Sequence, residues 1–176
     1  MSRLEIGLER LRLWDQALCI RLNYAVRIAP VRRLFRIISR LGDGVFWYAL
    51  MAVLLAVGGV HALLPVAHMA VIGFVCTLLY KWLKSKTSRP RPFAVESAVR
   101  AGADPLDAYS FPSGHTLHAV AFSVIAIAYY PMLAWLLVPF SVLVAISRVV
   151  LGLHYPSDVL AGAALGALIA SGSLCL

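Results

Sequence analysis

The sequence predicts an all-α protein, a polytopic membrane helical bundle of about five to six spans that includes or follows an N-terminal amphipathic helix. Two observations predict this fold class. Hydrophobic residues make up 61% of the 176 residues and charged residues 14%, whereas soluble domains are about half apolar and a quarter charged. The apolar residues also fall into five long runs, and a membrane span needs roughly 20 such residues in succession.

One domain is expected over residues 1–176, because no linker, internal repeat or low-complexity tract divides the chain. Its first part, residues 1–41, is rich in arginine and precedes a bundle over residues 44–175. Leucines recur near helical spacing in residues 4–28, while arginines and an aspartate interrupt any continuous apolar run. This pattern favours an amphipathic helix on the membrane interface. The alternative, a sixth tilted span, requires the burial of several charges.

Five apolar runs predict the spans of the bundle. Prolines lie at or beside three of their starts, where a missing N–H costs nothing, and Pro139 is expected to kink the fourth span. Gly162 and Gly166 belong to a pattern of small residues that lets the last helix approach its neighbours closely. The runs are residues 44–60, 65–83, 114–130, 132–150 and 156–175.

Charged residues are confined to three regions of the chain. All 16 Lys and Arg and all 8 Asp and Glu lie in the N-terminal segment, in or beside the 84–113 loop, or near the 148–158 junction. Two predicted spans separate each region from the next, so all three regions are expected on one face of the membrane. A catalytic loop over residues 84–113 is therefore expected on that face.

Three cations, Lys84, Arg91 and Arg148, are expected to meet at this face. Each alone has an ordinary interpretation, such as an interface anchor. A cluster of ionisable groups at the membrane ends of separate helices predicts a functional site instead. The cations can surround a tetrahedral oxyanion, and the forked donors of arginine match phosphate. Ser113 as a helix cap and Gly114 as a point of close approach add backbone donors for the same anion.

Two histidines and an aspartate predict chemistry on that phosphate. Asp158 lies four residues after His154, a spacing that lets its carboxylate fix the histidine tautomer and leave the other ring nitrogen free as a nucleophile. His115, in the first turn of the third predicted span, is placed to protonate the departing alkoxide as a general acid.

Three linked motifs resemble the signature of the type 2 phosphatidic acid phosphatase superfamily of membrane lipid phosphatases. They are Lys84 with Arg91-Pro92, "PSGH" at 112–115 and "SRVVLGLHYPSD" at 147–158. The resemblance implies a helical bundle and metal-independent hydrolysis of a lipid phosphate through a phosphohistidine intermediate, with no cofactor and no bound metal.

The resemblance also implies a role for each residue of the site. The phosphate-binding residues are Lys84, Arg91, Ser113, Gly114 and Arg148. The catalytic residues are His154 as nucleophile, Asp158 as its partner and His115 as general acid.

The expected partners are membrane lipids and a phospholipid or prenyl phosphate substrate, with no nucleic acid. Phosphatidic acid, phosphatidylglycerol phosphate and an isoprenyl diphosphate all fit, and hydrolysis of undecaprenyl pyrophosphate specifically is one alternative. A non-hydrolytic phosphate-lipid binder or transporter is another, although binding alone does not require the pair formed by His154 and Asp158. Vanadate-dependent haloperoxidase chemistry is a third alternative, and five apolar spans argue against it. The oligomeric state stays open.

The expected location is the bacterial cytoplasmic membrane. Nine arginines precede the first span, and the turns at 61–64 and 130–132 carry no positive charge. Basic segments are retained in the cytoplasm, so this bias favours a site that faces the cytoplasm. Bacterial members of the resembling family often work on the periplasmic side, which is the alternative, and a sixth span in the N-terminal segment would also favour it.

Overall fold

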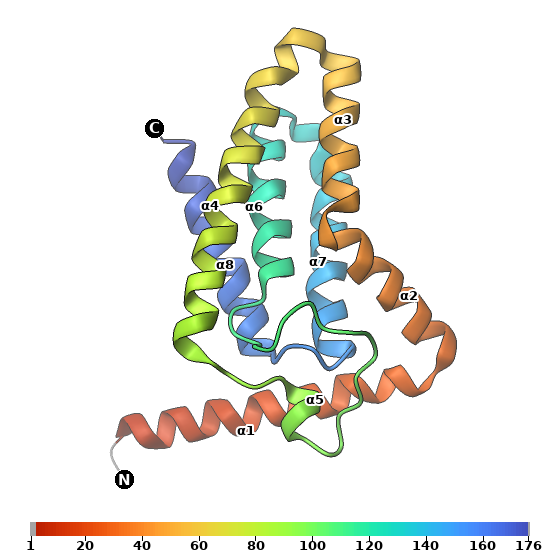
Figure 1. The fold of residues 1–176 in the computed structure, drawn as a ribbon, viewed down its shortest axis with the longest axis vertical. Coiled ribbons are helices and arrows are strands. Elements are labelled where there is room, and N and C mark those ends of the chain that lie inside the picture. Colours follow the sequence, from red (N-terminus) through yellow and green to blue (C-terminus); the bar gives the residue numbers. More distant parts are fainter. Residues whose placement is uncertain (1–2, 176) are drawn as a thin grey trace.

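The computed structural model describes residues 3–175 and consists of helices joined by turns and one long loop. Five helices form an elongated bundle (Figure 1). Each of them falls on one of the five apolar runs, so the prediction of an all-α bundle is confirmed. They are α3 (Phe46–Gly58), α4 (Leu63–Thr87), α6 (Gly114–Tyr129), α7 (Ala134–Val150) and α8 (Pro156–Ser173).

Helix α6 is the centre of the bundle and packs against α4, α7 and α8. Its side chains Leu117 and Ile125 are fully buried in the main core. The contact with α8 is closest, because a Cβ atom at Gly162 would overlap the carbonyl oxygen of Ser113, and one at Gly166 would overlap that of Leu117. The small residues of the last span therefore bring two helix backbones together, as their spacing predicts.

The outer surface of the bundle is apolar. Large hydrophobic side chains such as Val57, Phe74 and Trp135 are 84%, 64% and 85% exposed. Among residues 3–175, two helical stretches are long and apolar enough by themselves to cross a membrane, Ala29–Thr87 and Pro131–Val150, and α6 is apolar but shorter. A lipid environment accounts for such a surface, because water makes large apolar patches of this kind unfavourable.

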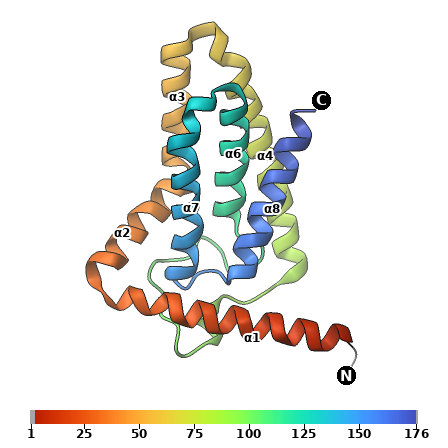
Figure 2. The same ribbon diagram turned by 180° about the vertical axis from the view of Figure 1, so that it is seen from behind.

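The N-terminal part forms two helices outside the bundle. Helix α1 (Arg3–Asn23) lies across one end of the bundle, and α2 (Ala29–Arg40) rises obliquely from there to α3 (Figures 1 and 2). Thus α1 does not run alongside the five bundle helices, as a sixth span would. Apolar residues are less segregated to one side of α1 than its leucine spacing predicts, whereas α2 separates its apolar and basic sides sharply.

A π turn, η2 (Leu41–Val45), connects α2 to α3. Gly44 has a φ angle of 129°, a conformation that favours glycine. A Cβ atom at Gly42 would lie 3.0 Å from a methyl group of Val144 on α7. The two glycines thus let the turn bend and pack closely against the bundle, with Asp43 between them.

The three charged regions lie at the same end of the bundle. Helix α1, the long loop with the short helix α5 (Pro92–Val95) and the turn between α7 and α8 are gathered there (Figure 1). The turns η3 (Gly59–Ala62) and η4 (Pro131–Leu133) are at the other end. The charged regions therefore share one end of the bundle, and their placement on one face of the membrane stays a prediction.

Candidate functional site

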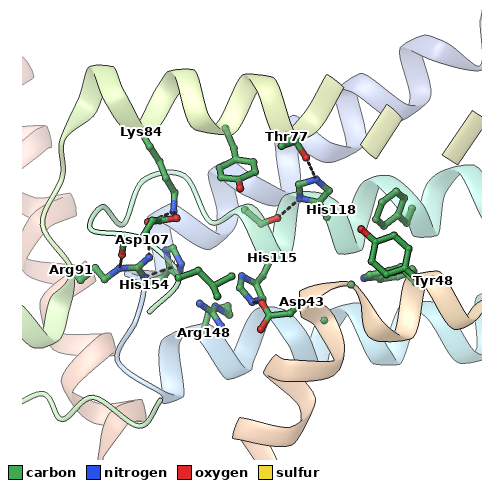
Figure 3. A pocket seen from close by; sticks show the side chains of 17 residues that line it. Asp43, Tyr48, Thr77, Lys84, Arg91, Asp107, His115, His118, Arg148 and His154 are labelled. Carbon is green, nitrogen blue, oxygen red and sulfur yellow. Dashed lines mark hydrogen bonds and ion pairs between the residues drawn. The ribbon is translucent and has the colours of Figure 1, made fainter. Parts of the chain in front are cut away.

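A cavity of about 200 Å³ opens at the charged end of the bundle. Its walls come from η2, α3, α4, α6, the end of α7 and the long loop (Figure 3). Six of the eight residues expected in the site line this cavity, and Ser113 and Asp158 lie outside its lining. The six are Lys84, Arg91, Gly114, His115, Arg148 and His154.

The three expected cations are buried side by side at one end of the cavity (Figure 3). Lys84 lies in the last turns of α4, Arg91 directly before α5, and Arg148 in the last turn of α7. They are 6%, 2% and 3% exposed, respectively. A buried charge is costly unless a counter-charge or hydrogen bonds compensate it, so the partners of these cations matter.

Asp107, in the long loop, is the counter-charge of two of the cations. Lys84 Nζ donates to both carboxylate oxygens of Asp107 at 2.7 and 2.8 Å, and Arg91 Nη2 donates to one of them at 2.8 Å. Arg91 Nε also donates to the main-chain carbonyl of Asp107 at 2.9 Å. Partial burial alone would raise the pKa of the Asp107 carboxyl, but its bonds to the two cations lower that pKa below its usual value. The anion site therefore already holds a carboxylate.

Arg148 makes different contacts. Its Nη1 atom donates to the hydroxyl of Ser39 on α2, and its buried Nε atom has no hydrogen-bond partner among residues 3–175. A buried donor without a partner is rare in folded proteins and calls for a bound group. The guanidinium thus keeps capacity for an anion in the cavity that it lines.

His154 lies in the turn between α7 and α8 and is 1% exposed. Its Nε2 atom is 3.4 Å from Arg91 Nη1, and Arg91 Nη1 also donates to the Leu153 carbonyl at 2.8 Å. Burial, together with the positive charges of Arg148 and Arg91, lowers the pKa of His154 well below its usual value. The imidazole is therefore neutral, with a lone pair available on one nitrogen.

Asp158 lies behind His154 but does not hydrogen-bond to it. The His154 Nδ1 atom is 3.7 Å from Asp158 Oδ2, a distance beyond that of a hydrogen bond. The carboxylate accepts instead from the Tyr155 backbone N–H at 2.8 Å and from Arg89 Nη1 at 2.6 Å. His154 and Asp158 are therefore adjacent, as expected, but the Asp158 oxygens accept hydrogen bonds from Arg89 and from the backbone N–H of the α8 capping box.

Arg89 also connects the site to the N-terminal helix. Its Nη2 atom donates to Asp15 of α1 at 2.8 Å, and Asp15 accepts from the Ser157 backbone N–H at 2.9 Å. Asp15 is 1% exposed. This ion-pair chain, which the motifs do not predict, fixes α1 to the start of α8 beneath His154.

Ser113 and Gly114 precede or begin α6 as expected, but they differ in their contacts. Ser113 occupies the N-cap position, yet its hydroxyl hydrogen-bonds to the Thr116 hydroxyl at 3.0 Å rather than to a backbone N–H. Gly114 lines the cavity, and a Cβ atom there would lie 3.4 Å from the ring of Tyr80. The helix start itself, rather than the serine side chain, is what faces the cavity.

His115 forms an ion pair with Asp43. Its Nε2 atom contacts the Asp43 carboxylate, which the π turn η2 supplies, and the two side chains adjoin in Figure 3. Asp43 lies outside the three sequence motifs of the site. The signal that marks it is the pair of flanking glycines in "GDG" at 42–44.

His118 also lines the cavity but is engaged in helix packing. Its Nδ1 atom is 2.8 Å from the Gly114 carbonyl oxygen, and its Nε2 atom is 3.1 Å from the Thr77 hydroxyl. The contact with Thr77 joins α6 to α4. His68, at the far end of the bundle, likewise contacts Tyr129 and Ser173.

The end of the cavity away from the cations is aromatic. Trp47 and Tyr48 of α3 and Phe122 of α6 line it, and Tyr48 marks this end in Figure 3. Trp47 is 1% exposed, so this tryptophan belongs to the core rather than to an interface belt. The cavity thus combines a cationic end with an apolar end, an arrangement suited to an amphiphile.

A second cavity of about 640 Å³ lies on the other side of Asp43, His115 and Arg148. Arg36 and Arg40 of α2 and the loop over residues 101–106 complete its walls. His115 and Arg148 line both cavities, whereas His154 lines only the first.

Comparison with known proteins gives a family match over residues 61–176 to the PAP2 superfamily. An undecaprenyl-diphosphatase of Sulfolobus acidocaldarius is 33% identical over 151 residues, which cover 84% of this chain and 71% of that protein. The undecaprenyl-diphosphatase BcrC of Bacillus subtilis is 38% identical over 90 residues, 51% of this chain and 42% of that protein. The chain spans about half the length, or less, of most of the curated relatives it matches.

A solved structure is similar over nearly the whole fold. It is the transmembrane PAP2 type phosphatidylglycerolphosphate phosphatase of Bacillus subtilis, with a TM-score of 0.74 and 27% identity. The similarity covers 94% of this chain and 85% of that one. The bundle therefore has the fold of a transmembrane PAP2 protein.

Asp107→Asn is expected to bind inorganic phosphate about 10-fold more tightly than the wild type, because the competing carboxylate no longer occupies the cations. The measurement is the phosphate-dependent rise of the unfolding temperature in detergent. Asp104→Asn, an exposed residue of the same loop, is the control for the change in net charge. Weaker phosphate binding in Asp107→Asn would contradict the competition and make Asp107 a support for the two cations.

Proposed function

Because this chain belongs to the PAP2 superfamily, we propose that it is a lipid phosphate phosphatase that needs no metal and works through a phosphorylated histidine. One observation carries the proposal. A neutral, buried His154 faces the same small cavity as three buried cations. The cations supply the charge neutralisation that a bound metal supplies in other phosphatases.

Substrate binding replaces the Asp107 carboxylate by a phosphate. Lys84 and Arg91 already bind an anion of similar size there, and the free Nε of Arg148 offers a further donor. The start of α6 at Gly114 adds backbone N–H groups and the positive end of a helix. The bound phosphate then lies among donors from four separate elements.

In the first step, His154 Nε2 attacks phosphorus. The N–P bond forms while the P–O bond to the lipid breaks, and His115 donates a proton to the departing oxygen. The free lipid alcohol, or a lipid monophosphate when the substrate is a diphosphate, leaves. Asp158 and Arg89 act as the support of His154 and hold the turn that carries it.

In the second step, water attacks the phosphohistidine. His115 takes a proton from this water, the N–P bond breaks, and inorganic phosphate is released with His154 restored. The second cavity, which His115 also lines, gives water and phosphate a polar route that the lipid does not occupy. This arrangement suits a histidine that serves first as acid and then as base.

The substrate is proposed to be a lipid phosphate whose apolar part lies along the aromatic end of the cavity, toward Trp47, Tyr48 and Phe122. Relatives named undecaprenyl-diphosphatase and a structural relative named phosphatidylglycerolphosphate phosphatase support two classes to test first. These are isoprenyl diphosphates and glycerophospholipid monoesters.

Purified protein in detergent is expected to release phosphate from at least one of these lipids in the presence of excess EDTA. His154→Ala is expected to lower kcat by at least about 10³-fold, because it removes the nucleophile. Phosphate release is measured with a colorimetric assay. His61→Ala is the control, since His61 is an exposed histidine at the opposite end of the bundle.

Two outcomes would contradict this proposal. Loss of activity on chelation with recovery on addition of Mg²⁺ would overturn the metal-free mechanism. Phosphate-lipid binding without any turnover by the wild type would favour a binder or transporter instead.

We also propose that α3, α4, α6, α7 and α8 cross the cytoplasmic membrane and that the site faces the cytoplasm. The arginines of α1 and α2 lie at the same end as the site, and the opposite turns carry no Lys or Arg. Basic segments next to spans are retained in the cytoplasm, and they bind the anionic inner leaflet.

A single cysteine tests this orientation. Ser97→Cys, in the exposed part of the long loop, is introduced into a variant whose three native cysteines are replaced by alanine. A membrane-impermeant thiol reagent is expected to label it only after lysis of spheroplasts. Labelling in intact spheroplasts would place the site on the periplasmic side.

A further inference from the structure

We propose that Asp43 is a positioning residue that holds the Nε2 proton of His115 and so makes the opposite nitrogen, Nδ1, the atom that exchanges protons with the substrate. This inference rests on the proposed function and extends it. The site then contains two His–Asp pairs, one behind the nucleophile and one behind the general acid.

The contact itself is the first observation. The Asp43 carboxylate forms an ion pair with His115 Nε2, and the His115 side chain is only 8% exposed. The buried Nε2 atom has no other polar partner among residues 3–175, and no polar contact of the His115 Nδ1 atom is seen in that part of the chain. One ring nitrogen thus has a fixed acceptor, and the other is left for a group that enters the cavity.

The chain conformation that presents Asp43 is the second observation. Asp43 lies within the π turn η2, between a glycine with φ of 129° and a glycine packed against Val144. Single π turns inside helices occur frequently at functional sites. A regular helix through residues 41–45 would keep more of its hydrogen bonds but would present Asp43 at a different angle. The π turn η2 therefore places the Asp43 carboxylate against His115.

The charges around His115 are the third observation. Arg148 of α7, Lys84 of α4 and His154 of the 151–155 turn face it, and Arg40 of α2 acts on Asp43 from the other side. Burial among cations disfavours a protonated imidazole. The other carboxylate that lines the cavity, Asp107, is bound to Lys84 and Arg91. Asp43 is thus the carboxylate that stabilises the protonated form of His115.

The proton balance follows from this geometry. Protonated His115 gives its Nδ1 proton to the departing lipid oxygen and keeps the Nε2 proton, which Asp43 accepts as a hydrogen bond. Neutral His115 then takes a proton from the attacking water at the same Nδ1 atom. Asp43 stays ionised in both steps, as an orienting carboxylate does in other acid–base pairs.

The test compares two substrates in the variant Asp43→Asn, which preserves shape and removes the charge. With a lipid phosphate, whose alkoxide needs a proton, kcat/KM is expected to fall about 100-fold. With 4-nitrophenyl phosphate, whose leaving group needs none, the rate of release of nitrophenolate in the first turnover is expected to change less than about 3-fold. Glu9→Gln, at an exposed carboxylate of α1, is the matched control and is expected to behave as the wild type with both.

Two further readouts separate a positioning role from a structural one. The alkaline limb of the pH profile with the lipid is expected at lower pH in Asp43→Asn, because the protonated imidazole has lost its counter-charge. Asp43→Asn is also expected to add no further loss in a His115→Asn background.

Equal losses with both substrates, or an unshifted alkaline limb, would overturn the role of Asp43 while the wild type still hydrolysed lipid phosphate. Absence of hydrolysis by the wild type would instead overturn the proposed function. The unfolding temperature of Asp43→Asn with and without vanadate shows that the variant is folded and that its anion site is intact.

Discussion

The structure depends on how three buried cations are compensated at one end of an apolar bundle. Lys84, Arg91 and Arg148 each come from a different segment, and their mutual repulsion in a low-dielectric cavity opposes their assembly. The Asp107 carboxylate neutralises two of them, so the long loop must fold back over the cavity. If a substrate phosphate takes over that task, as we propose, the same electrostatic requirement serves both stability and binding.

A second consequence of this constraint concerns the histidines. Cations nearby keep His154 neutral, which suits a nucleophile, but they also oppose the charged form that an acid needs at His115. The fold resolves this conflict by placing one carboxylate behind each histidine, with different contacts. Asp43 forms an ion pair with His115. The Asp158 carboxylate lies 3.7 Å from His154 Nδ1 and accepts hydrogen bonds from Arg89 and from a backbone N–H instead. Two similar side chains thereby acquire different electrostatic surroundings.

The sequence predicts the bundle and the gathering of the candidate site residues at one end, because both follow from chain order. Alternate spans return to the same face, so motifs at their ends must meet there. The sequence does not predict the role of Asp107, because this residue lies in a loop without a periodic pattern. It does not predict the role of Asp43 either, because the position of this side chain depends on a π turn whose sequence signal is a pair of glycines. The i to i+4 spacing of His154 and Asp158 is right, but spacing does not reveal that Arg89 and the α8 capping box use the carboxylate.

The covalent role of His154 is the central claim, and detection of a phosphohistidine tests it most directly. The His115→Asn variant is mixed with 4-nitrophenyl phosphate. The first step still proceeds, because the nitrophenolate leaving group needs no acid. The second step is slow, because the variant lacks the base that activates water, so the phosphohistidine accumulates. The reaction is quenched in alkali, because phosphohistidine is labile in acid, and the digested protein is analysed by mass spectrometry. Phosphate is expected on His154 and on no other residue. Nitrophenolate release without any phosphorylated His154 would contradict it.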